Sequence, residues 1–306
     1  MQAILRGIRL LVLGGDRREM VMVRCLADLG CHIYTVGHRP YDGYPSIVGV
    51  EDLRMYPDAL PEIDVVIAPM SHTDALGRVR DVPDKDAVII IDDELCEKFP
   101  PKVPLFIGMA QPIIKKLAER HCLQLIETAN IDEIAILNSI PTAEGAVQIA
   151  MEELPITIHD SRVLVLGMGR CGLTLARMLA GLGAKVCVID RSLAHLARAK
   201  EMGLDAADLS ELGNRVETAD VIFNTIPAQL ITKRILYGMN KETLIVDIAS
   251  APGGVDFAAA RELGIRAVLA AGLPGRVAPV TAGRILGRCM PQIILKALAK
   301  PIPARS

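Results

Sequence analysis

The sequence predicts an α/β protein made of two domains, each built on a parallel sheet that is covered by helices on both faces. Short aliphatic runs alternate with stretches of helical periodicity twice along the 306 residues, as in strands joined by crossover helices. Hydrophobic residues make up 51% of the chain and aromatic residues only 3%, so the cores are expected to consist of Val, Ile, Leu, Ala and Met. The strands of buried parallel sheets have this aliphatic composition.

In the first half, six aliphatic runs predict strands, and two stretches between them, 17–29 and 112–121, carry apolar residues at helical spacing. The strand-like runs are residues 8–13, 31–36, 65–68, 87–91, 105–107 and 123–126. This alternation predicts a parallel sheet with right-handed crossovers. We expect residues 1–140 to form an N-terminal, flavodoxin-like α/β domain.

Residues 131–154 interrupt the alternation. They predict a helix over 132–138, a kink at residues 139–141, and a second helix that begins at Thr142. Proline next to Thr and Glu is a normal start signal for a helix, which is why a new helix is expected there. A helical connection of this kind is typical of a hinge between domains.

The second alternation occupies residues 141–280 and predicts the second domain. Its strand-like runs are 162–166, 185–189, 221–224, 244–248 and 267–269, with helices expected around 172–182, 193–202 and 255–263. Residues 272–279 are expected to form a loop. We expect the last helix, 281–299, to pack back on the first domain.

Composition excludes several classes of function. A net charge of −2 favours neither nucleic acid nor an anionic membrane as partner. The seven cysteines include no CxxC pair and no zinc-finger spacing, so we expect reduced thiols and no metal site. The aliphatic run 8–13 is too short to span a membrane and is not a signal peptide. These features predict a cytoplasmic protein.

Residues 167–172 form a GxGxxG motif that directly follows the strand 163–166 and opens a helix. Gly167 permits the tight turn, Gly169 lets the backbone approach a pyrophosphate, and Gly172 allows close helix–strand packing. The motif alone is weak, but this context predicts an NAD(P)-binding Rossmann fold; a structural turn without ligand is the alternative. The contacts expected here are Gly167, Gly169, Arg170, Cys171 and Gly172.

The choice between NAD and NADP depends on residues 190–192. Asp190 would accept hydrogen bonds from the ribose 2′-hydroxyl of NAD. Arg191 and Ser192 could instead hold the 2′-phosphate of NADP through charge-assisted hydrogen bonds. We favour NADP slightly and leave NAD open.

Later strand ends should face the same cofactor, because ligands of open α/β sheets bind at the carboxyl edge. Ordinary strand-to-helix loops are the alternative interpretation. The residues nominated in this way are Thr225, Ile226, Pro227, Ala249, Ser250, Leu273 and Pro274.

Several motifs in a fixed order point beyond a generic Rossmann protein. They are residues 14–17 (GGDR), 138–145 (NSIPTAEG), 157–159 (TIH), 224–227 (NTIP), 252–257 (PGGVDF) and 272–275 (GLPG), with Ala278 and Pro279. Together with the GxGxxG motif, they make nearly the whole chain resemble the dipicolinate synthase A-subunit family of spore-forming Gram-positive bacteria.

The resemblance implies a function. Members of that family oxidise a dihydrodipicolinate-type intermediate of the lysine pathway to pyridine-2,6-dicarboxylate with NAD(P)+, in the mother cell of a sporulating bacterium. They work with the flavoprotein-like B-subunit of dipicolinate synthase, and we also expect a homo-oligomer. A family member that uses NADP would be expected to have Ala where this chain has Asp190, so the cofactor choice stays open.

A dicarboxylate substrate calls for Arg side chains or for hydroxyl and amide donors. Arg17 follows the first strand, Asn138 and Ser139 lie at the hinge, and Arg276 lies in the loop after the last strand. Solvated side chains and helix capping are the alternatives. The residues predicted to contact substrate or to move a proton are Arg17, Ser71, His72, Asn138, Ser139 and Arg276.

Two other functions remain open. The first is another two-domain dehydrogenase, of the hydroxyacid, alanine or shikimate type. A shikimate-type enzyme would need a catalytic Lys–Asp pair in the first domain, yet no Lys precedes Lys85; a hydroxyacid enzyme needs a late His, yet none follows His195. The second is an NAD(P)-binding protein without turnover.

Overall fold

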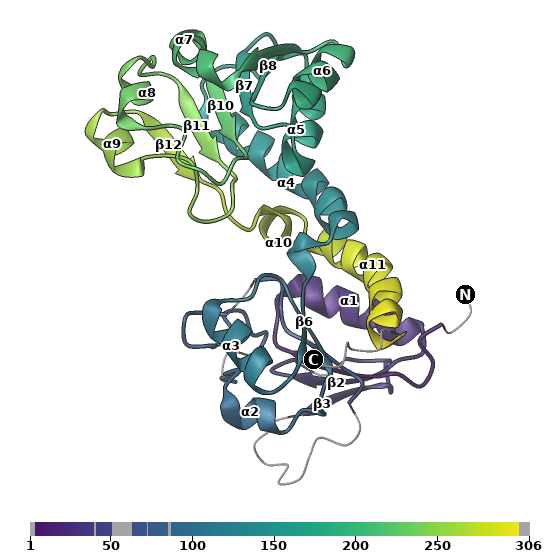
Figure 1. Cartoon of the computed structure of the whole chain (residues 1–306). Coiled ribbons are helices and arrows are strands. Elements are labelled where there is room, and N and C mark those ends of the chain that lie inside the picture. The colour runs from purple at the N-terminus through teal and green to yellow at the C-terminus, as the bar shows by residue number, and fades with distance from the viewer. Residues whose placement is uncertain (1–3, 40, 51–62, 72, 85–86, 300–306) are drawn as a thin grey trace. The chain divides into compact units, whose positions relative to one another are not determined.

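The computed structural model describes residues 4–39, 41–50, 63–71, 73–84 and 87–299. The chain divides into two compact units, Met1–Ala135 with Ala278–Ser306 (unit 1) and Ile136–Val277 (unit 2). Each unit contains a six-stranded sheet in which all the strands are parallel (Figure 1). The predicted fold class is therefore confirmed.

Unit 1 is built on the sheet β3-β2-β1-β4-β5-β6. Its elements are β1 (Arg9–Leu13), α1 (Arg17–Asp28), β2 (His32–Val36), β3 (Ile47–Val50), β4 (Val65–Ile67), α2 (Asp93–Glu97), β5 (Pro104–Ile107), α3 (Pro112–Arg120), β6 (Gln124–Glu127) and α11 (Pro279–Ala299).

The order of this sheet differs from the flavodoxin-like order expected from the sequence. Without β3 the order would be flavodoxin-like, but Ile47–Val50 pairs with β2 and extends the sheet to the Rossmann order. Residues 87–91, predicted as a strand, form only an isolated antiparallel bridge between Ile90 and Arg78. Sequence patterning missed β3 because a four-residue strand with a glycine carries little signal.

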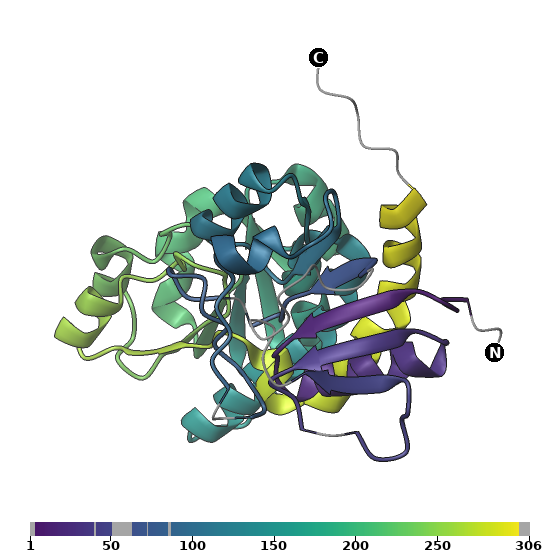
Figure 2. The same ribbon diagram turned by 90° about the horizontal axis from the view of Figure 1, so that it is seen from below.

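Both faces of the first sheet are covered. Leu11 and Leu13 of β1 lie in a buried cluster with Leu95 of α2 and Leu117 of α3. Helix α11 lies alongside α1, as Figures 1 and 2 both show. A Cβ added to Gly283 of α11 would lie 2.5 Å from the carbonyl oxygen of Arg18 and 2.6 Å from Val21 Cβ, so the two backbones approach closely.

Unit 2 is built on the sheet β12-β11-β10-β7-β8-β9. Its elements are α4 (Asp132–Glu153, which starts in unit 1), β7 (Arg162–Leu166), α5 (Arg170–Gly181), β8 (Lys185–Asp190), α6 (Leu193–Glu201), β9 (Asp205–Asp208), α7 (Leu212–Arg215), β10 (Val221–Asn224), α8 (Lys233–Tyr237), β11 (Leu244–Asp247), α9 (Phe257–Glu262), β12 (Arg266–Leu269) and α10 (Leu273–Val277).

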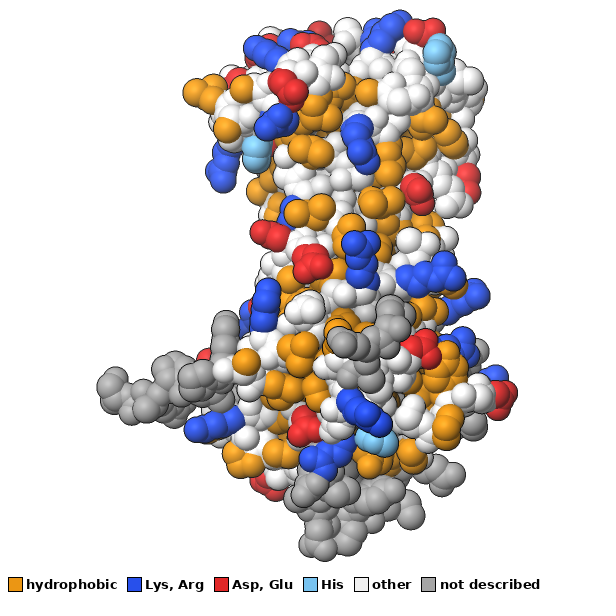
Figure 3. All heavy atoms as spheres, turned by 90° about the vertical axis from the view of Figure 1, so that its right-hand side faces the viewer, with side chains coloured by type: hydrophobic (Ala, Val, Ile, Leu, Met, Phe, Trp, Pro, Cys, Tyr) orange, Lys and Arg blue, Asp and Glu red, His pale blue; other side chains and the backbone are white. Residues whose placement is uncertain are grey.

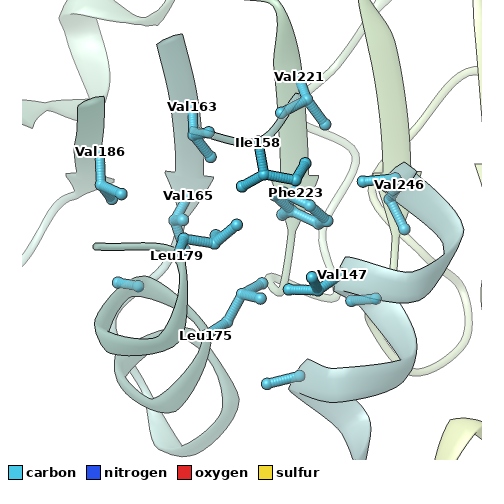
Figure 4. Close-up of a cluster of buried hydrophobic side chains, with 14 of the residues drawn as sticks. Val147, Ile158, Val163, Val165, Leu175, Leu179, Val186, Val221, Phe223 and Val246 are labelled. Carbon is cyan, nitrogen blue, oxygen red and sulfur yellow. The ribbon is translucent and has the colours of Figure 1, made fainter. Parts of the chain in front are cut away.

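Alternate residues of each strand in unit 2 face opposite layers. Val163, Val165 and Phe223 pack with α4 and α5, as Figure 4 shows, whereas Leu164 and Ile222 pack with α7, α8 and α9 on the other face. Phe223 is fully buried, and truncating such an aromatic side chain to Ala costs about 3–5 kcal/mol. The two aliphatic layers therefore hold the carboxyl ends of the strands in a rigid frame.

The prediction of two helices on either side of residues 139–141 is wrong, because α4 is one continuous helix with Pro141 inside it. Proline lacks the N–H that would pair with the preceding turn. Hydroxyl groups beside it bond to the two neighbouring helix carbonyls: Ser139 Oγ donates to the Ile136 carbonyl (2.6 Å) and Thr142 Oγ1 to that of Asn138 (2.7 Å). These local bonds, together with burial of Ala143 and Ala146, keep the helix intact.

The predicted loop at 272–279 is also wrong in part, since Leu273–Val277 forms the short helix α10. Leu273 is 1% exposed and belongs to the core of unit 2. The glycine and proline residues of this segment suggested a loop. Burial of the Leu273 side chain gives a reason for the helical turn that forms instead.

Within the described residues, no helix is long and apolar enough to cross a membrane. On the face that Figure 3 displays, Lys and Arg side chains are interspersed with Asp and Glu, in keeping with the small net charge of −2.

Candidate functional site

The carboxyl ends of β7 and β10 form the switch point of the second sheet, where the chain order reverses. The GxGxxG motif lies there. Gly167 has a φ of 90°, and a Cβ on it would lie 2.6 Å from Thr225 Oγ1. A Cβ on Gly172 would overlap the Gly167 carbonyl oxygen. Both positions therefore require glycine, as the motif predicts.

The amino end of α5 is open. Its N-cap, Gly169, has no side chain with which to cap the helix, and a Cβ on it would meet no protein atom within 4 Å. Arg170 is exposed beside it. Cys171 is a thiol rather than a thiolate, because burial raises the pKa of its side chain. The helix thus presents backbone N–H groups and its positive dipole end to open space, which suits a pyrophosphate.

Asp190, at the end of β8, braces this loop. Its carboxylate accepts hydrogen bonds from the backbone N–H groups of Met168 and Ser192 (both 2.8 Å) and from His195 Nδ1 (2.9 Å). Burial alone would raise the pKa of Asp190, but these bonds outweigh it and lower the pKa. Asp190 is therefore an ionised group that joins the glycine loop to the start of α6.

The two residues after Asp190 differ in exposure. Arg191 is exposed, and Ser192 is the N-cap of α6, where its hydroxyl accepts the His195 N–H (3.4 Å). The Asp190 carboxylate, with His195 bound to it and Arg191 and Ser192 following it in the chain, lies at the strand end where the adenosine ribose of a dinucleotide is expected.

A buried pair links the ends of the next two strands. Asn224 and Asp247 are register partners on β10 and β11, and both are fully buried. Asn224 Nδ2 donates to Asp247 Oδ1 (2.8 Å), and the Asp247 carboxylate also accepts the N–H groups of Ala249 (3.1 Å) and Gly254 (2.8 Å). Asn224 in turn binds both the N–H and the carbonyl of Ile226. This pair fixes the loops that follow both strands.

Those loops carry five of the predicted cofactor residues. Thr225 Oγ1 donates to the Leu166 carbonyl (2.8 Å), so the threonine binds β7 at the start of the glycine loop. Ile226 is half-buried, Pro227 and Ser250 are exposed, and Ala249 is buried. All five lie at the carboxyl edge, where the sequence predicted them.

The remaining predicted residues of unit 2 are more dispersed. Arg276 is exposed and Pro274 half-buried on α10, whereas the Leu273 side chain is committed to the core. Ser139 is fully buried, and its hydroxyl lies 2.6 Å from Thr174 Oγ1, so it joins α4 to the glycine-motif helix. Asn138 Oδ1 is buried with no hydrogen-bond partner among the described residues. Contacts of these residues with substrate stay a prediction.

In unit 1, Arg17 is exposed at the first position of α1. Ser71 follows β4, and its Oγ atom is buried without a partner in the described part of the chain; the same is true of Thr73 Oγ1. His72 lies outside the described residues. Ser71 and Arg17 stay predictions as contacts of the substrate.

Sequence reasoning passed over the residues beside Arg17. Arg18 is buried and pairs with Asp16 through two hydrogen-bonding nitrogens, and Glu19 is 1% exposed. The spacing of Asp16 and Glu19 is that of a capping box, which was a readable signal. Asp247 was missed as well; aligning the strands 221–224 and 244–247 by their last residues would have paired it with Asn224.

Unit 2 fits a dinucleotide on its own geometry. The open amino end of α5, the open space at Gly169 and the acidic residue at the end of the next strand are the three features that such a ligand needs. Among the described residues, no group of three or more His, Cys, Asp or Glu side chains is arranged to hold a metal ion.

Two family models match the chain. The N-terminal domain of the dipicolinate synthase A-subunit matches residues 9–129. The alanine dehydrogenase/PNT C-terminal domain, an NAD(P)-binding fold, matches residues 138–298.

Individual proteins agree with these matches. The dipicolinate synthase A-subunit of Bacillus subtilis is 39% identical over 300 residues, which cover 97% of this chain and 99% of that protein. The crystal structure of the dipicolinate synthase A-subunit from Bacillus halodurans has a TM-score of 0.89 at 36% identity, with 97% of this chain and 99% of that chain covered.

A more distant likeness concerns the fold alone. The transhydrogenase from Sinorhizobium meliloti has a TM-score of 0.67 at 15% identity, with 94% of this chain and 93% of that chain covered. The full-length relatives are the decisive ones: the chain belongs to the dipicolinate synthase A-subunit family and carries an NAD(P)-binding domain of the alanine dehydrogenase/PNT type.

Proposed function

We propose that this protein oxidises a dihydrodipicolinate-type intermediate to dipicolinate with NADP+ or NAD+, together with a flavoprotein-like B-subunit. The observation that carries the proposal is the open amino end of α5 in a chain that is 39% identical, over 97% of its length, to the dipicolinate synthase A-subunit of Bacillus subtilis. A protein with this activity would act in the cytoplasm of the mother cell of a sporulating bacterium.

The chemistry makes modest demands on the protein. A ring carbon of the dihydropyridine loses a hydride and the ring loses one proton, which leaves the aromatic pyridine-2,6-dicarboxylate. The nicotinamide, when bound, accepts the hydride. Because aromatisation drives the reaction, the side chains need mainly to hold the ring in a near-attack position, bind two carboxylates and take up a proton.

The residues divide between these tasks. In unit 2, the N–H groups at the start of α5 would hold the pyrophosphate, and the loops fixed by Asn224 and Asp247 would line the nicotinamide end. Arg17, Ser71, His72, Asn138 and Arg276 are the proposed contacts of the dicarboxylate. Ser139 is proposed to contribute through its bond to Thr174, which sets the position of α5.

NADP is the cofactor that we favour. Arg191 is exposed directly after Asp190. Its guanidinium would suit a 2′-phosphate near residues 190–192. The Asp190 carboxylate itself favours NAD, so the preference is expected to be small.

The test is an assay of the purified protein, alone and with the B-subunit, given freshly generated intermediate and either NADP+ or NAD+. Reduced nicotinamide is followed by absorbance and dipicolinate by terbium luminescence. Both signals should rise together, faster with one cofactor. Cofactor binding without either signal, with the partner present, would instead favour a non-catalytic NAD(P)-binding protein.

A further inference from the structure

Glu19 in unit 1 is a charged residue with almost no solvent contact. It is 1% exposed, and glutamate is rarely buried to this extent unless it is paired. Its two carboxylate oxygens bind two different loops. Oε2 accepts the Asp16 N–H (2.8 Å) and Oε1 accepts the Met70 N–H (2.8 Å).

The first of these bonds is part of an ordinary capping box at the start of α1. The second is not, because Met70 is 51 residues away and follows β4. Strands β1 and β4 are neighbours at the switch point of the first sheet, the place where open α/β sheets bind their ligands. Glu19 therefore bridges the two loops on either side of that point.

The local sequence accommodates this bridge. Gly15 has a φ of 116°, and a Cβ on it would lie 2.5 Å from Glu19 Cγ, so the glutamate side chain folds directly over the glycine. From the other side, the Thr128 hydroxyl lies 3.0 Å from Met70 Sδ. Met70 is thus held at its backbone by Glu19, and its side chain lies against the Thr128 hydroxyl, which is also 3.0 Å from the Ile107 carbonyl oxygen.

The segment that begins at Met70 carries unused donors. Ser71 Oγ and Thr73 Oγ1 are buried and have no hydrogen-bond partner among the described residues. Buried hydroxyl groups without a partner are rare in native proteins, because each costs about 1–3 kcal/mol. Thr73 is fully buried, whereas Ser71 is half-buried, so a ligand that accepts hydrogen bonds, such as a carboxylate, would satisfy Ser71.

We propose that Glu19 is a positioning residue that fixes Met70 and the adjoining Ser71, so that the Ser71 hydroxyl donates to a carboxylate of the substrate. The inference deepens the proposed function and rests on it for the identity of the substrate. It adds a residue that lies behind the substrate rather than in contact with it.

Ionisation of Glu19 matters because a protonated carboxyl group cannot accept both N–H groups equally well. Burial raises the pKa of Glu19 to about 7, although Arg18 and the N–H groups of Met70 and Asp16 act in the opposite direction. The negative charge of Asp16 raises the pKa of Glu19 further. The negative charge of Asp81 raises the pKa of Arg18. Tyr41, after β2, faces the same carboxylate, since the charge of Glu19 adds to the burial that raises the pKa of Tyr41. The double bridge should therefore form as the pH rises through about 7.

The first experiment compares Glu19→Gln with a matched control, Glu127→Gln, in the assay with the B-subunit. Glu127 also accepts a backbone N–H after a neighbouring strand, that of Ala110 (2.9 Å). For Glu19→Gln we expect the KM for the dicarboxylate intermediate to rise at least about tenfold, while the cofactor Kd changes less than about twofold. In the unsubstituted protein, kcat/KM should increase as the pH rises through about 7, because Glu19 ionises. This increase should be absent in Glu19→Gln.

A second measurement needs neither a variant nor turnover. Hydrogen exchange of the Met70 amide in the unsubstituted protein, corrected for the intrinsic rate, should become slower as the pH rises through about 7. The Ala110 amide, bound to Glu127, reports any global opening.

The outcomes separate the two proposals. If the unsubstituted protein makes no dipicolinate, the proposed function fails, and the exchange of the Met70 amide still tests the bridge. If dipicolinate forms but Glu19→Gln matches Glu127→Gln in KM and pH profile, Glu19 is merely structural and the inference is overturned. A Met70 amide that exchanges as fast above neutrality as below it overturns the inference as well.

Discussion

The two units share one sheet topology and differ at the helix that follows their first strand. In unit 1 the amino end of α1 is closed, because the Asp16 carboxylate accepts the Arg18 N–H and Glu19 folds back over the loop. In unit 2 the amino end of α5 is open, because its N-cap is Gly169. Unit 1 supplies its own anions at the positive end of the helix dipole, whereas unit 2 leaves that place to a ligand.

The two units thus share a topology, and the residue at the N-cap decides whether the chain itself supplies an anion at the start of the helix. An open cap has a small cost, since glycine at an N-cap is only a few tenths of a kcal/mol less stable than Asp or Ser. In each unit a buried carboxylate joins two loops: Glu19 joins those after β1 and β4, and Asp247 joins those after β10 and β11.

The strongest test of this comparison is to close unit 2 in the way that unit 1 is closed. Gly169→Asp places a carboxylate where the pyrophosphate is expected, with no protein atom in its way. The Kd for reduced cofactor, measured by fluorescence titration, should rise more than about 100-fold, while thermal stability stays equal or increases slightly.

Gly181→Asp is the control, since Gly181 ends the same helix and also faces open space. It should change the cofactor Kd by less than about twofold, whatever it does to stability. Unchanged affinity in Gly169→Asp would mean that the ligand does not use the amino end of α5.

The next effect concerns the buried carboxylate of unit 2. Asp247→Asn replaces an acceptor oxygen by a donor and leaves one of three N–H groups unpaired. We expect a loss of about 1–3 kcal/mol in the free energy of unfolding, measured with denaturant, and a rise of about tenfold or more in the cofactor Kd of the folded protein.

Asp220→Asn is its matched control. Asp220 accepts the Arg162 N–H (2.7 Å) and joins β10 to β7 at the opposite, amino-terminal edge of the same sheet. It should lose stability with little change in Kd. Equal changes of Kd in both variants would show that Asp247 only supports the fold.

A smaller effect is expected in cofactor choice. Asp190→Ala removes the carboxylate that favours a ribose hydroxyl and opposes a phosphate. It also removes the hydrogen bond from the Met168 N–H and so loosens the glycine loop. The loss of affinity from that loosening should be the same for both cofactors. The ratio of the NADP to the NAD affinity should therefore rise about tenfold. A ratio that does not move would place the adenosine ribose elsewhere.

The smallest effect is the pH dependence of stability in unit 1. Burial raises the pKa of Glu19 from an ordinary value of 4.5 to about 7, so the folded protein binds this proton more tightly than the unfolded chain. The contribution of this proton to the free energy of unfolding is fully present below the pKa that Glu19 has in the unfolded chain. It is lost as the pH rises through about 7. Relative to Glu19→Gln, the unsubstituted protein should lose about 1 kcal/mol between pH 6 and 8 in denaturant unfolding. A constant difference between the two proteins would contradict the raised pKa.

Much of unit 2 could be predicted from the sequence because its signals are local. The strand 163–166, the three glycines and Asp190 lie within one βαβ segment, and each has a direct backbone consequence. The strand ends at Asn224 and Ala249 follow from the rule that parallel strands share a carboxyl edge. The continuous helix α4 could not be predicted, because Pro141 is a local stop signal that neighbouring hydroxyls and buried alanines override.

Unit 1 was harder because the Glu19 bridge includes a contact between residues far apart in the sequence. Arg17 stood out in the sequence as a cation after a glycine turn, yet Arg18 is the buried one and Arg17 is exposed. The capping box of Asp16 and Glu19 was visible, but nothing nearby in the sequence indicates Met70 as the second partner of Glu19.

By itself, the sequence determined the number of domains, their parallel sheets, the cofactor-binding half and the family, because periodicity, glycine motifs and ordered motifs are properties of neighbouring residues. The tertiary structure alone decided that β3 completes the first sheet, that Asp247 and Asn224 share a buried bond, and that Glu19 loses its water and joins two distant loops. Burial and pairing depend on which strands become neighbours, and only the folded sheet sets that.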